Sequence, residues 1–268
     1  MSTTVFRLAA AFLAGVLTLL AVSFSLSEYY GEEQQRLAAA GDPRGALEAS
    51  RRAVWLDPFD TEALEAQASL LQQQQRYEEA AAALREATER DPVNYLPYLF
   101  LANLQATMDD YDAAAESYRD VLRLNPKASV ASVYLAQILT TQGKLEEAKE
   151  EYLTLEREGR ITFKGLYDLG RIEVRTGEAE EGLRDIKKAR RQGAAELDRL
   201  DGPLKEQREQ LLVSMDLAIA DALVVVGRED RAAEVLEASP SEQAPSLLNL
   251  LYSNPEAYRE QVVNSEIY

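Results

Sequence analysis

Cysteine and histidine are both absent from the 268-residue sequence. Without cysteine, the chain can form no disulfide, supply no thiolate ligand and offer no cysteine nucleophile. Without either residue, the usual zinc sites and the Ser-His and Cys-His catalytic pairs are excluded. The sequence also contains no phosphate-binding run of the form G-x-x-x-x-G-K-[ST] or G-x-G-x-x-G. We therefore expect no enzyme activity, no cofactor and no bound metal.

Positive charge is scarce as well: Lys and Arg number 29 against 46 Asp and Glu, which gives a formal net charge of −17. Nucleic-acid binding needs a cationic surface, so we expect no nucleic-acid partner. Carboxylate pairs such as Glu78-Glu79 and Glu146-Glu147 are common, but catalytic carboxylates need a pocket that pushes their pKa values apart. Acidic residues are stabilised in the first turns of helices, so we expect these pairs to lie in solvent at helix starts.

A repeat of 34 residues organises most of the chain. A small residue recurs at one position of the repeat, here called the small column: Ala46, Ala80, Ala114 and Ala148. Proline recurs at another position, the proline column: Pro58, Pro92 and Pro126. A turn column runs through Gly41, Gln75, Asp109, Gly143 and Gly177. Between turn and proline, apolar residues recur three and four apart, which is typical of one helix face. Because proline ends a helix, each unit is predicted to hold two helices, with the alanine where they cross closely.

These columns resemble the tetratricopeptide (TPR) repeat, a 34-residue helix-turn-helix unit. The matching residues of the third and fifth units are Tyr98, Leu101, Ala102, Ala114, Tyr118 and Pro126, then Leu166, Leu169, Gly170, Gly182 and Ile186. The resemblance implies an all-α fold, a TPR-like right-handed α-solenoid, with five repeats over residues 27–195. It also implies a concave groove that binds protein partners.

The register weakens toward the C-terminus. Arg160 and Ala194 replace the closing proline, and the next turn glycine, Gly227, comes 50 residues after Gly177 instead of 34. We expect an irregular insert plus a degenerate sixth repeat over residues 196–240, with a long helix that ends near Val226, and C-terminal capping helices over 241–268.

The N-terminal region carries a second signal. Residues 8–26 form an uncharged run of 19 residues, about 28 Å long as a helix and close to the thickness of a bilayer core. We predict a single transmembrane anchor in residues 1–26, with 5–26 in the membrane. Arg7 precedes the run and acidic residues follow it, so the N-terminus is expected in the cytoplasm and the repeats outside, at a plasma membrane. The alternative is a signal peptide cleaved near Ala21-Val22-Ser23, which leaves an exported soluble protein.

The repeat register also predicts which residues line the groove. It is expected to begin acidic, with Glu62 and Glu65 among its residues, and to become apolar and then basic. The predicted partner-binding residues are Leu96, Leu99, Phe100, Asn103, Val130, Val133, Tyr134, Gln137, Lys164, Tyr167, Arg171 and Arg175. Exposed apolar patches commonly mark interaction sites. Alternatively, some of these side chains face a neighbouring unit or lie under the segment 196–226.

Two function classes remain open on the sequence alone. The first is a membrane-anchored extracytoplasmic TPR scaffold of bacterial type that assembles or stabilises an envelope or membrane protein complex. The run AAAGDPRGALEASRRAVWLDPFDTEALEAQA is similar to the TPR tails of O-antigen ligase and polymerase-like membrane proteins. An accessory subunit of a cell-envelope glycan-assembly enzyme, or a pilus or secretion assembly factor, is therefore the alternative. A buried carboxylate pair that faces the groove with raised pKa values would favour an enzymatic role.

Overall fold

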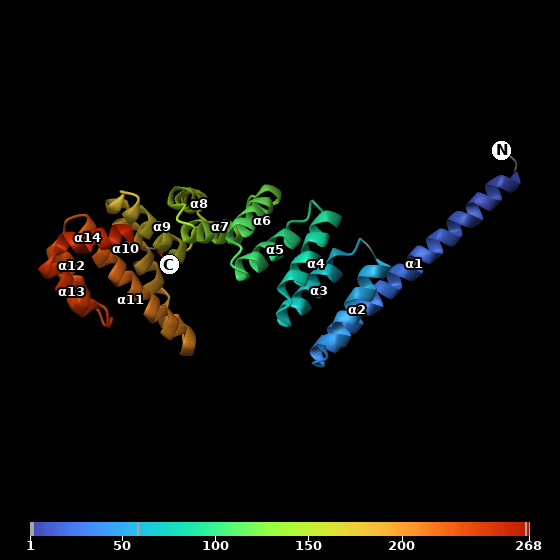
Figure 1. Ribbon diagram of the computed structural model, residues 1–268, viewed down its shortest axis with the longest axis horizontal. Helices are drawn as coiled ribbons and strands as arrows, with labels where there is room; N and C mark the ends of the chain where they lie inside the picture. Colours follow the sequence, from blue (N-terminus) through green and yellow to red (C-terminus); the bar gives the residue numbers. More distant parts are fainter. Residues whose placement is uncertain (1–2, 58, 266, 268) are drawn as a thin grey trace. The chain divides into compact units, whose positions relative to one another are not determined.

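The computed structural model describes residues 3–57, 59–265 and 267, and every regular element among them is helical (Figure 1). Contacts divide the chain into two compact units, residues 1–126 and 127–268. Each unit consists of helices that pack against their neighbours in the chain, as in a TPR-like solenoid. The predicted all-α fold class is confirmed.

The first unit holds three helical pairs. Its helices are α1 (Thr3–Ala39), α2 (Pro43–Leu56), α3 (Thr61–Gln73), α4 (Tyr77–Arg90), α5 (Tyr95–Thr107) and α6 (Tyr111–Leu124). Ala46, Ala80 and Ala114 are fully buried, and each lies on the second helix of its pair. This burial confirms that the small column marks close helix crossings.

The turn column lies where each pair reverses direction. Gly41, Gly143 and Gly177 all have positive φ, and so do Gln75 and Asp109, both at 59°. The left-handed conformation ends the first helix of each pair, as at many helix C-termini. The second helices end at Leu56, Arg90 and Leu124. Pro92 and Pro126 follow two of these ends, while Pro58 lies outside the described residues.

The second unit continues the pairs and then departs from them. Its α-helices are α7 (Ser129–Thr141), α8 (Leu145–Arg157), α9 (Phe163–Arg175), α10 (Ala179–Ala195), α11 (Gly202–Val225), α12 (Glu229–Ala238), α13 (Ala244–Ser253) and α14 (Pro255–Asn264), with a short 3-10 turn at Leu197–Arg199. The long helix expected to end near Val226 is α11. The division into domains stays a prediction.

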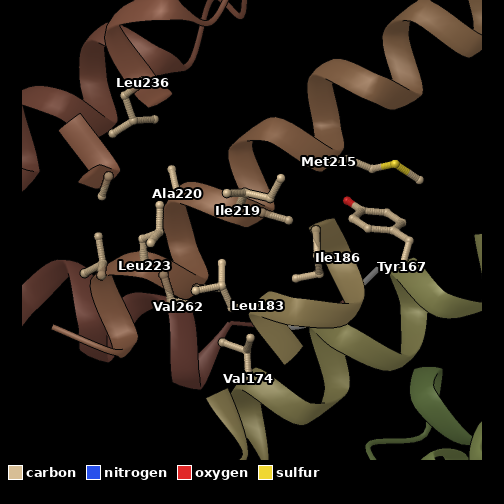
Figure 2. Close-up of a cluster of buried hydrophobic side chains, with 14 of the residues drawn as sticks. Tyr167, Val174, Leu183, Ile186, Met215, Ile219, Ala220, Leu223, Leu236 and Val262 are labelled. Carbon is tan, nitrogen blue, oxygen red and sulfur yellow. The ribbon is translucent and has the colours of Figure 1, made fainter. Parts of the chain in front are cut away.

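The core of the second unit gathers around α11. Figure 2 shows side chains from α9, α10, α11, α12 and α14 pointing into one cluster, among them Tyr167, Ile186 and Met215. Glycines bring α9 and α10 unusually close: a Cβ atom on Gly170 would lie 2.7 Å from the carbonyl oxygen of Gly182. The irregular segment that follows α10 contains α11, and α11 packs against α9 and α10, the last regular pair.

The N-terminal helix is unbroken from Thr3 to Ala39, so no helix boundary falls at residue 26. It is the one helix among the described residues that is long and apolar enough to cross a membrane, and its apolar portion is not buried by the rest of the chain. A signal sequence near the N-terminus would meet the same criteria of length and composition.

Candidate protein-binding faces

The first candidate face belongs to the first unit and is called here the α5 face. It comprises Leu96, Leu99, Phe100 and Asn103 on α5, beside Glu62 and Glu65 on α3. A cavity of about 840 Å³ opens between these helices, lined by both glutamates and by Leu96, Phe100 and Asn103. Phe100 is 41% exposed, whereas Leu99 is half-buried. The register therefore places three of the four predicted α5 residues on one open cavity.

Two polar features shape the α5 face. The hydroxyl of Tyr118 on α6 donates a hydrogen bond to Oδ1 of Asn103 at 2.6 Å, which fixes the orientation of this amide at the cavity wall. Partial burial raises the pKa of Glu65, and the nearby charges of Glu62 and Asp60 raise it further. Carboxylates thus repel one another along this face, which makes it complementary to a cationic group.

The second candidate face lies on α7 in the second unit and is called here the α7 face. Val130 and Tyr134 are exposed, Tyr134 by 43% of its surface. Val133 and Gln137 are half-buried. These four residues thus lie along one side of α7 and form a mainly apolar, partly exposed surface.

The position of Tyr167 differs from the one expected for a partner-binding residue. It is only 7% exposed, and its hydroxyl donates a hydrogen bond to the backbone oxygen of Ser214 on α11 at 3.4 Å. The alternative holds for this residue: it lies under the segment 196–226. The physical reason is that α11 buries the aromatic ring in the core of the second unit.

The basic cluster on α9 is partly occupied by the chain itself. Nε of Arg175 donates to the carbonyl oxygen of Ser265 at 3.1 Å, and its second terminal nitrogen donates to Oγ of Ser265 at 3.0 Å. The guanidinium group of Arg171 donates to the carbonyl of Ile267 and lies over the ring of Tyr167, 5.2 Å from its centroid. Lys164 is exposed. Sequence reasoning missed this contact, because Ser265 and Ile267 stand outside the repeat pattern.

A pair of buried carboxylates lies on α9 and α10. Glu173 and Asp185 are both buried. Burial raises the pKa of Glu173 to about 8, and the charges of Asp185 and Glu178 add to this rise. Burial also raises the pKa of Asp185, and the charge of Glu156 contributes. Because both side chains are enclosed where α9 and α10 pack together, they lack the open groove position that an enzymatic role requires.

Residues 35–95 and 101–160 match the family model described as tetratricopeptide repeat. No curated protein shows significant similarity to the sequence.

Solved structures resemble the fold at low sequence identity. The MamA protein is 18% identical with a TM-score of 0.57, and the match covers 66% of this chain and 97% of that one. A structure described as the functional characterization of Pseudomonas aeruginosa pilF is 16% identical with a TM-score of 0.56, covering 89% and 97%. YrrB, described as a TPR protein with an unusual peptide-binding site, is 18% identical with a TM-score of 0.51, covering 60% and 82%. At such identities the likeness concerns the fold.

Proposed function

Because the comparisons support the tetratricopeptide repeat family for residues 35–95 and 101–160, we propose that this protein is a membrane-anchored scaffold that binds protein partners through its α5 and α7 faces. The observation that carries the proposal is the exposure of Leu96, Phe100, Val130 and Tyr134. A repeat scaffold needs apolar side chains between its helices, but it does not need them on open faces. These four therefore suit contact with another protein.

Helix α1 supports the anchor in this proposal. Phe12, Leu19 and Leu20 are among its exposed apolar side chains, and such a surface is stable in lipid but costly in water. Arg7 before the run and Glu28, Glu32 and Glu33 after it favour a cytoplasmic N-terminus and repeats outside the membrane. In this proposal the N-terminal anchor is not cleaved, whereas cleavage would leave an exported soluble protein.

The anchor also suggests where the partners are. Repeats held at a membrane surface meet other membrane and envelope proteins at high effective concentration. We accordingly propose that the scaffold assembles or stabilises a membrane or envelope complex. Subunits of glycan assembly, pili or secretion systems would all fit this description, and identifying the partner separates them.

Cross-linking in intact membranes followed by mass spectrometry tests the proposal directly. We expect the parent chain to capture one or a few membrane proteins reproducibly. The double variant Phe100→Asp/Tyr134→Asp should lose them, because a carboxylate on each face opposes apolar contact. The matched control is Val93→Asp/Leu204→Asp, which places the same charges at exposed apolar positions outside both faces.

Three outcomes are informative in this experiment. Loss of the partner in the face variant alone, with unchanged helical melting curves, supports the proposal. Equal capture by the parent and the face variant would overturn the role of the two faces. Release of the parent chain from membranes by alkaline carbonate would overturn the anchor.

A further inference from the structure

Helix α2 runs back along α1 toward the N-terminus of the chain. Oγ of Ser27 donates a hydrogen bond to the carbonyl of Ala53 at 3.0 Å, and Oγ of Ser23 donates to the carbonyl of Leu56 at 2.6 Å. The end of α2 therefore lies beside residue 23 of α1, and Figure 1 shows α2 lying along α1. Residue 23 is still inside the uncharged run of residues 8–26, so the first repeat covers the last turn of the apolar segment.

The part of α1 that α2 leaves uncovered has the length of a bilayer core. It runs from Thr3 to about Val22, and about 20 helical residues extend about 30 Å. Arg7 lies near the start of this stretch, where a long cationic side chain can reach the headgroups of the opposite leaflet. The hydrocarbon core of a bilayer is about 30 Å thick. A membrane around this stretch would reach its polar boundary at the end of α2.

Two aromatic side chains are exposed at that boundary. Trp55 lies in the last turn of α2 and is 80% exposed, and Phe59 lies in the following turn and is 87% exposed. The amide of Phe59 donates to Oδ1 of Asp57 at 2.9 Å, which holds this turn in place. Exposing aromatic rings to this extent in water costs free energy, and burial in the interfacial region of a bilayer removes that cost.

The repeat register indicates that the fold does not require aromatic residues there. The positions equivalent to Trp55 in the next three units are Glu89, Arg123 and Arg157, all of them exposed. The positions equivalent to Phe59 are Val93, Lys127 and Ile161. Only the unit that packs on α1 carries two aromatic residues at these places, so the aromatic pair accompanies the apolar helix.

We propose that the end of α2 and the turn that follows it lie in the headgroup region of the bilayer that α1 crosses, with Trp55 and Phe59 as interfacial anchors. This inference rests on the proposed membrane anchor. It adds that the first repeat sits against the lipid surface and is not held away from it. Arg52 lies one turn further from the membrane, with its guanidinium over the ring of Tyr30, 5.5 Å from the centroid.

Trp55 is the only tryptophan in the chain, so its fluorescence reports on this position without any substitution. The experiment uses the full chain in phosphatidylcholine vesicles, because a net charge of −17 opposes anionic lipid. We expect emission at a shorter wavelength than that of a tryptophan fully exposed to water. We also expect stronger quenching by lipids brominated near the headgroup than by lipids brominated at the end of the acyl chain.

The absence of cysteine provides a matched control. Phe59→Cys and Val93→Cys each carry one thiol, at equivalent turns of adjacent units, for an environment-sensitive dye. The dye at position 59 should brighten severalfold on addition of vesicles, and the dye at position 93 should change little.

The outcomes separate the two levels of the proposal. Trp55 that stays accessible to aqueous iodide and unquenched by brominated lipid, in a chain that floats with the vesicles, would overturn this inference alone. Trp55 that is shielded from iodide yet unquenched by brominated lipid would show that protein covers it in place of lipid, and this result would overturn the inference as well. Release of the chain by alkaline carbonate would overturn the anchor and the inference together.

Discussion

Gly170 and Gly182 meet backbone to backbone where α9 crosses α10, and a Cβ atom on Gly170 would lie 2.7 Å from the carbonyl oxygen of Gly182. Gly182 occupies the position that Ala148 and the other alanines hold in earlier units. The fifth pair is therefore closer than the others, and even a methyl group is too large for it.

Replacing Gly182 with Ala should therefore destabilise the second unit, although it restores the residue of the other repeats. We expect a loss of about 1–3 kcal/mol from overpacking, against a gain of at most about 1 kcal/mol from helix propensity. Denaturant unfolding followed by circular dichroism measures the net change. Gly31→Ala is the control, because a Cβ atom there would meet nothing within 4 Å, and it should stabilise its helix. A stabilising Gly182→Ala would contradict the close crossing.

The buried carboxylate of Glu173 should make stability depend on pH. Its pKa is about 8 in the folded chain against an ordinary 4.5. Between these values the folded state holds a proton that the unfolded chain has released, so stability falls as pH rises through this window. We expect a loss of about 1–3 kcal/mol between pH 5 and pH 8 from this group.

Glu173→Gln should flatten that dependence and raise the melting temperature at pH 8, because the neutral amide has the shape of the protonated acid. Thermal unfolding at several pH values measures it. Glu78→Gln, which removes one exposed carboxylate from α4, should leave the slope as in the parent chain. Parallel curves for the parent and Glu173→Gln would show that Glu173 is ionised in the fold.

The hydroxyl of Tyr258 should stabilise the capping helices through one hydrogen bond. It donates to Oδ1 of Asp221 on α11 at 2.8 Å, and Tyr258 is fully buried. Burial raises the pKa of Asp221, and this hydrogen bond opposes the rise. Tyr258→Phe should cost about 1–3 kcal/mol, because the partly buried carboxyl group of Asp221 loses its donor.

Tyr252→Phe supplies the comparison for that measurement. The hydroxyl of Tyr252 donates to Oε1 of Glu237 at 3.1 Å, but the side chain is exposed. Its loss should cost less than about 0.5 kcal/mol. Equal effects of the two substitutions on denaturant unfolding would show that the Asp221 contact adds nothing.

The contact of Ser265 and Ile267 with α9 should compete with a peptide added in trans. Deleting residues 265–268 removes the carbonyl and hydroxyl groups that Arg171 and Arg175 hold. We expect a labelled peptide with the sequence NSEIY to bind the shortened chain at least tenfold more tightly than the full chain, measured by fluorescence anisotropy. The same peptide with Asp in place of Ile is the control, because Ile267 is buried. Equal affinity for both chains would contradict competition at this site.

The repeat register predicted more of the fold than residue type alone could. Gln75 and Asp109 are not residues that single out a left-handed turn, yet their column with Gly41 and Gly143 placed the turn correctly. The alanine column likewise located the helix crossings, because a 34-residue period repeats the same contacts in each unit.

The parts that escaped prediction depend on contacts outside the repeat. The burial of Tyr167 under α11 was an alternative that the sequence left open without assigning it to this residue. The occupation of Arg171 and Arg175 requires Ser265 and Ile267 to contact α9, and no sequence pattern indicated this contact. A periodic pattern fixes neighbours within and between units, but it holds no information about an irregular segment that packs on them. Whether the twelve predicted groove residues bind a partner stays a prediction.

Helix α1 carries the first repeat without an intervening linker, since it is continuous from Thr3 to Ala39 and α2 is bonded to it at Ser23 and Ser27. A tilt or rotation of such a helix therefore moves the repeat that is attached to it. If α1 tilts or turns within a bilayer, the α5 face must turn through the same angle as long as the first unit stays rigid. A change in lipid thickness or in a neighbouring membrane helix would then be transmitted as torque to the partner on that face.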